Sequence, residues 1–91
     1  MSEARLKTYR QIGPFDETSL PAGLLAEHRL KPGTWGRMEM IAGAVMLVWD
    51  DEAGGRERLS AGDIARIPPQ RPHHLEPEGP FTLSIAFQRP A

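Results

Sequence analysis

The residues with the clearest chemical potential lie in the stretch "PPQRPHHLEP", Pro68 to Pro77, which holds the adjacent histidines His73 and His74 and the acid Glu76. The third histidine of the chain, His28, lies far upstream. Neutral imidazole is the commonest protein ligand for zinc and other divalent ions, and two imidazoles with a carboxylate make a usable open site. These residue types therefore predict a divalent metal site, with zinc as the first expectation.

The segments around these histidines must present them to a common point. Prolines fix the backbone dihedral and remove amide donors, so the proline-rich stretch 68–77 is expected to be a stiff loop. In "LLAEHRL" a two-residue alternation places His28 on the apolar face with Leu24 and Leu30. The same alternation lets His73 or His74 face inward, but not both. A buried histidine with a hydrogen-bonded partner is the competing interpretation of His28.

Length and composition restrict the class of protein. The 91 residues fit one domain, 1–91, with residues 1–5 expected to be a flexible N-terminus. The net charge is −1 and the basic residues are scattered, which gives no support for nucleic-acid binding. The chain has no cysteine, no signal-peptide pattern and no apolar run near the ~20 residues of a membrane span. We expect a soluble, cytoplasmic protein without a membrane partner.

Glycines and prolines occur at the spacing of turns and leave only short segments between them, which is typical of an all-β protein. We expect strands in an antiparallel barrel or sandwich with little helix, at residues 24–30, 34–42, 44–49, 63–67 and 81–88. A further strand is expected at 6–12, and a hairpin returns through 56–59. Trp35, Met38 and Met40 are candidates to line a pocket, although packed core positions are the ordinary role for such side chains.

Two family resemblances follow from these motifs. The spacing in "GDIARIPPQRPHH", from Gly62 through Pro68 to His73, resembles the second sequence motif of the cupin superfamily, with departures at Gln70 and Pro77. The first cupin motif has no counterpart for its paired histidines. The order "TSLPAG", "EHRLKPGTWG", "PPQRPHHLEP" and "LSIAF" resembles more closely the TehB/YeaR-like domain, a short cupin-type domain, over nearly the whole chain. No glycine-rich nucleotide loop of a methyltransferase is present.

The resemblance implies a small cupin-type jelly roll with a pocket, more than it implies an activity, and it selects His73 as the inward histidine. The expected metal ligands are then His28, His73 and Glu76, with His74 outside, and an exposed surface carboxylate is the competing interpretation of Glu76. We expect a module that binds a divalent metal or a small molecule, as a homodimer, and the resemblance links it to tellurite or oxyanion stress. The alternatives are a small metal-dependent oxygenase or isomerase, and a degenerate cupin that serves as a dimerising or partner-binding domain.

Overall fold

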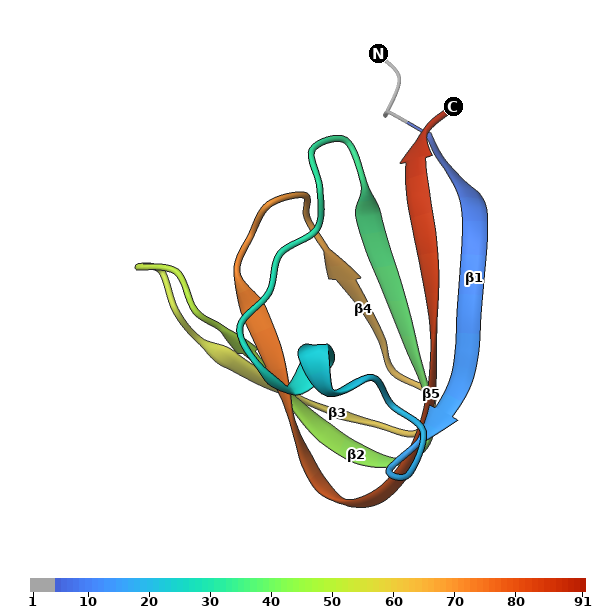
Figure 1. Cartoon of the computed structure of the whole chain (residues 1–91), viewed down its shortest axis with the longest axis vertical. Coiled ribbons are helices and arrows are strands. Elements are labelled where there is room, and N and C mark those ends of the chain that lie inside the picture. The colour runs from blue at the N-terminus through green and yellow to red at the C-terminus, as the bar shows by residue number, and fades with distance from the viewer. Residues whose placement is uncertain (1–4) are drawn as a thin grey trace.

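The structure, a computed structural model of the chain, describes residues 5–91 and consists of one antiparallel sheet with a single short helix (Figure 1). The strands and the 3₁₀ helix are β1 (Leu6–Asp16), η1 (Ala22–Leu25), β2 (Trp35–Trp49), β3 (Arg56–Ser60), β4 (Ile64–Ile67) and β5 (His73–Pro90). The strand order is β1-β5-β2-β3, and β4 also pairs with β2. The all-β expectation is confirmed, although the sheet does not close into a barrel.

The long strands β2 and β5 pair from Trp35 opposite Gln88 to Trp49 opposite His73, and both bend near the middle (Figure 1). Their register shifts on either side of Gly43, where φ is +72°. A Cβ at this position would lie 2.2 Å from the backbone oxygen of Pro80, so only glycine fits the bend. The bend turns the two ends of the sheet toward each other, and they enclose a core that includes Met38, Met40, Val45, Leu47, Leu75 and Leu83.

Most of the expected strands are present. The predicted segments 34–42 and 44–49 form one continuous strand, β2, because the bend at Gly43 does not interrupt its pairing with β5. The segments 63–67 and 81–88 correspond to β4 and to part of β5, and the hairpin return corresponds to β3. The prediction for 6–12 is confirmed by β1, which extends to Asp16.

Two local predictions are wrong. Residues 24–30 do not form a strand: the amide of Leu24 donates to the carbonyl of Pro21, which starts the turn of η1, and only His28 makes a bridge to the sheet. The stretch 68–77 is not a loop throughout, because β5 begins at His73 and pairs there with Trp49. Three of the prolines, Pro68, Pro69 and Pro72, precede the strand and therefore do not interrupt its pairing.

The chain ends of the described segment lie together at one edge of the sheet. The amide of Ala91 donates to the carbonyl of Arg5 at 2.9 Å, so Arg5 is held beside the last residue. The other residues of the expected flexible N-terminus, 1–4, lie outside the described segment. Within residues 5–91 no helix is long and apolar enough to cross a membrane.

Candidate functional site

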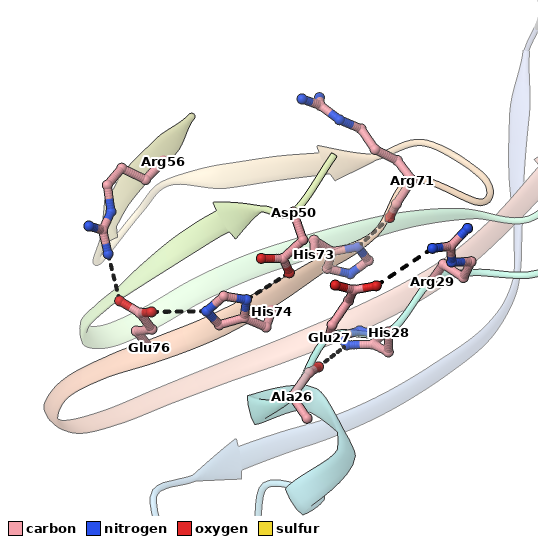
Figure 2. Close-up of polar contacts among 10 residues, drawn as sticks. All are labelled: Ala26, Glu27, His28, Arg29, Asp50, Arg56, Arg71, His73, His74 and Glu76. Atoms are coloured by element: carbon pink, nitrogen blue, oxygen red, sulfur yellow. Dashed lines mark hydrogen bonds and ion pairs between the residues drawn. The ribbon is translucent and has the colours of Figure 1, made fainter. Parts of the chain in front are cut away.

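His28 and His73 are held side by side by the backbone. The amide of His28 donates to the carbonyl of His73 at 3.0 Å, and the amide of His73 donates to the carbonyl of His28 at 2.9 Å. Residues that exchange both bonds across an antiparallel bridge project their side chains to the same side. The two rings accordingly lie in contact, with centroids 4.2 Å apart and planes at 60° (Figure 2).

Each ring also makes a hydrogen bond to a backbone carbonyl, and this bond fixes its tautomer. Nδ1 of His28 lies 3.0 Å from the carbonyl oxygen of Ala26, and Nδ1 of His73 lies 2.8 Å from that of Arg71. A carbonyl can only accept, so each Nδ1 carries a proton. When the rings are neutral, both Nε2 atoms therefore present a lone pair. Histidines that bind metals through Nε2 are commonly oriented in this way, by an Nδ1–H bond to a backbone carbonyl.

His73 is held in its neutral form by its surroundings. The side chain is almost fully buried, at 2% exposure, and contacts the ring of Trp49 at a centroid distance of 5.7 Å. Burial lowers the pKa of His73, which outweighs the opposite effect of the bond to the Arg71 carbonyl. The neighbouring ring of His28 lowers this pKa further. At neutral pH the site therefore contains an uncharged imidazole, the form that binds metals.

The two histidines share a small apolar cavity of about 20 Å³, large enough for one water-sized group. Its walls come from η1, the loop after it, and strands β2, β4 and β5. The lining residues are Leu24, His28, Met38, Ile67, His73, Leu75 and Ile85. Among the lining residues only the two histidines, through Nε2, and Met38 have side chains with a lone pair that could bind a metal, and none of the lining residues is acidic.

His74 and Glu76 lie on the opposite face of β5, away from the cavity (Figure 2). Nδ1 of His74 is 2.7 Å from a carboxylate oxygen of Asp50, and its Nε2 is 2.9 Å from one of Glu76. Glu76 also accepts a bond from Arg56 at 2.6 Å. The carboxylates of Asp50 and then Glu76 raise the pKa of His74. The expected outward position of His74 is thus observed.

The expected three-residue ligand set is not brought together, because Glu76 lies on the outer face of β5 with His74. Within residues 5–91 no group of three histidine or acidic side chains is placed to hold a metal ion. Alternation along β5 explains this, since residues 74 and 76 share one face and residues 73 and 75 the other. The same signal that separated the two adjacent histidines could have placed Glu76 outside.

The expected pocket residues have different positions. Met38 lines the cavity, and Met40 is buried in the core beyond it. Trp35, at the start of β2, is half-buried and does not line the cavity. Trp49 is the tryptophan that contacts His73, and sequence reasoning missed it. Its alternation with Val45 and Leu47, which are buried on the same side of β2, was the available signal.

Comparisons with known proteins agree with this fold. The family model described as the TehB-like domain matches residues 10–85. The crystal structure of TehB from Haemophilus influenzae is similar with a TM-score of 0.85 and 22% identity, over 93% of this chain and 32% of TehB. A crystal structure of a protein from E. coli strain K12 is similar with a TM-score of 0.86 and 24% identity, over 100% of this chain and 99% of that protein. None of the curated proteins matches the chain.

Proposed function

The chain belongs to the TehB-like domain family, and from this premise we propose that it is a small metal-binding module whose ion is held by His28 and His73. The observation that carries the proposal is the matched pair of Nδ1 bonds to backbone carbonyls. These bonds leave an Nε2 lone pair free on each of two rings that are in contact. Such an arrangement pre-organises both ligands before an ion arrives.

The donor set fits some ions better than others. Two imidazoles suit zinc, copper and other late transition metals, whereas magnesium and calcium require oxygen ligands that this cavity lacks. Zinc is the divalent ion that the histidines alone predict. The thioether of Met38 on the same wall is a soft ligand, and it favours Cu(I) as a second candidate. Neither ion would acquire four protein ligands, so positions would remain for water or a small ligand.

Two further features of the proposal come from the family resemblance. These are a cupin-type jelly roll and a link to tellurite or oxyanion stress, whereas a cytoplasmic location is proposed from the absence of cysteine. The chain spans 32% of TehB, so the activity of that longer protein does not transfer with the shared domain. A metal with open positions would also suit a small oxygenase or isomerase.

A partner-binding or homodimeric role is the alternative that a separate observation favours. Ile41 and Ile64 are each about half exposed, at 49% and 48%, and within residues 5–91 β1 stands at one end of the strand order β1-β5-β2-β3. Exposed apolar side chains and open edges are features that protein partners use. This role requires no metal, so the metal experiment separates the two functions.

Thermal unfolding with and without zinc or Cu(I) tests the proposed function. An ion that binds only the folded state increases the free energy of unfolding by about 2.7 kcal/mol when its concentration is one hundred times Kd. The melting temperature therefore rises. The shift should disappear in His28→Ala and in His73→Ala and persist in the matched control His74→Ala. It should also weaken at about pH 5, where histidines hold their protons. Absence of any shift in the parent protein would reject the metal site and favour the partner-binding role.

A further inference from the structure

A second hollow, separate from the histidine cavity, lies between β1, the end of β5 and the loop that leads into β2. It is an open groove of about 310 Å³, a size found among sites for small organic ligands, which start at roughly 300 Å³. It shares no lining residue with the histidine cavity. The lining residues are Tyr9, Arg10, Arg29, Leu30, Lys31, Thr34 and Phe87.

A bulge in β1 explains how two neighbouring residues line one groove. Thr8 pairs with Gln88 and Arg10 pairs with Phe87, so Tyr9 is an additional residue opposite an unbroken part of β5. In a regular strand Tyr9 and Arg10 would project to opposite faces. The bulge re-aims them, and both contribute to the groove. The hydroxyl of Tyr9 is then fixed by a 3.0 Å hydrogen bond to that of the buried Thr34.

The groove is strongly cationic although the whole chain carries a net charge of −1. Arg10, Arg29 and Lys31 line it, no acidic residue does, and the guanidinium of Arg89 stacks on the ring of Tyr9 at 4.6 Å. Within residues 5–91 neither Arg10 nor Lys31 has a carboxylate within salt-bridge distance. Arg29 has only an exposed contact with Glu27 at 3.6 Å, and such pairs contribute little.

Apolar surface adjoins these charges. Phe87 and Leu30 are half-buried and pack against the core, so their positions are fixed by the fold. A ligand in the groove would contact an aromatic ring, an aliphatic side chain, and guanidinium and ammonium groups. Arginine binds carboxylates and phosphates through paired N–H donors, and aromatic rings stack with planar ligands.

We propose that this groove binds a small organic anion, in which a phosphate or carboxylate group is attached to a planar apolar body. The anionic group would be bound by Arg10, Arg29 and Lys31, and the apolar body would lie against Phe87. The volume of the groove exceeds what a bare inorganic oxyanion fills, and the apolar contacts would give such an ion nothing. The inference does not depend on metal binding at His28 and His73.

Titration with phenyl phosphate, followed by NMR or calorimetry, tests the groove. We expect saturable binding at about millimolar concentration or tighter, as for a small fragment, with inorganic phosphate and phenol both binding much more weakly. Arg10→Gln and Lys31→Gln should each weaken binding roughly fivefold to tenfold by removing a charged hydrogen-bond donor. Substituting these exposed residues leaves the core intact, so the variants should fold.

Arg66→Gln is the matched control, because Arg66 is an exposed arginine on β4 that does not line the groove. It removes the same charge and should leave the affinity for phenyl phosphate unchanged. His28→Ala should also bind normally, since the groove and the histidine cavity are separate. Equal losses in Arg10→Gln and Arg66→Gln, equal binding of phenyl phosphate and inorganic phosphate, or no saturable binding would each overturn the proposal. The same titration with benzoate in place of phenyl phosphate then shows whether the groove binds a carboxylate or a phosphate more tightly.

Discussion

His73 and His74 are adjacent in the sequence and have opposite environments. His73 is buried against His28 and Trp49, and its pKa is lowered mainly by burial. His74 lies on the other face of β5 between the carboxylates of Asp50 and Glu76, which raise its pKa. The surroundings of His73 favour the neutral ring, which has a free lone pair, and those of His74 favour the positively charged ring.

The difference shows that strand alternation, more than residue type, decides what a histidine can do. Both rings have their Nδ1 bonded to oxygen, but the partner of His73 is a neutral carbonyl and that of His74 is a carboxylate. A carbonyl selects a tautomer, whereas a pair of carboxylates stabilises the doubly protonated ring. The chemistry of the site thus depends on which residue β5 turns inward.

The largest expected difference between the two histidines is in stability. His73→Ala removes a buried ring and leaves the Arg71 carbonyl without its partner, so the free energy of unfolding should fall by about 2–4 kcal/mol. His74→Ala removes a contact near the surface and should cost about 1 kcal/mol or less. Urea denaturation at neutral pH measures both. Similar losses in the two variants would mean that His73 is not a packed core residue.

A smaller difference should appear in the pH dependence of stability. The folded-state pKa of His74 is raised, so its contribution is complete below the unfolded value of about 6.5 and is lost as the pH rises through the folded pKa. His74→Gln should therefore cost more stability at about pH 6 than at about pH 9. The folded-state pKa of His73 is lowered, so stability is lost as the pH falls below the unfolded value.

His73→Gln is the complementary variant, because it should remove that acid-dependent loss and reverse the trend seen for His74→Gln. Urea unfolding between about pH 6 and about pH 9 measures both, a range in which the ordinary carboxylates remain ionised. Parallel pH profiles for the two variants would contradict the assignment of opposite charge states.

Sequence pattern was sufficient for much of the fold and for part of the site. Alternation predicted the first part of β2 and the second half of β5, since each has one buried face, while the hairpin and the short strand before the prolines predicted the rest of β2 and β4. Alternation also placed His28 on an apolar face and one residue of the 73–74 pair inward, and the family resemblance chose His73. The two rings are indeed in contact.

The remaining features depend on contacts distant in sequence. The segment that holds His28 has the alternation of a strand but receives only one bridge from β5, because η1 and the following turn direct the chain away from the sheet. Alternation within a segment does not reveal how much of it finds a pairing partner. The groove on β1 depends on a bulge that only the register with β5 defines, and no local pattern indicated it.

The most direct test of a shared site is NMR of protein labelled with ¹⁵N in the histidine rings, recorded during titration with zinc and, separately, with Cu(I). If His28 and His73 bind one ion, their Nε2 resonances should shift together and saturate at one equivalent, while both Nδ1–H signals remain. The ring of His74 should be unaffected. A shift at only one of the two inward histidines, a shift at His74 instead, or no response to either ion would contradict a metal site at His28 and His73.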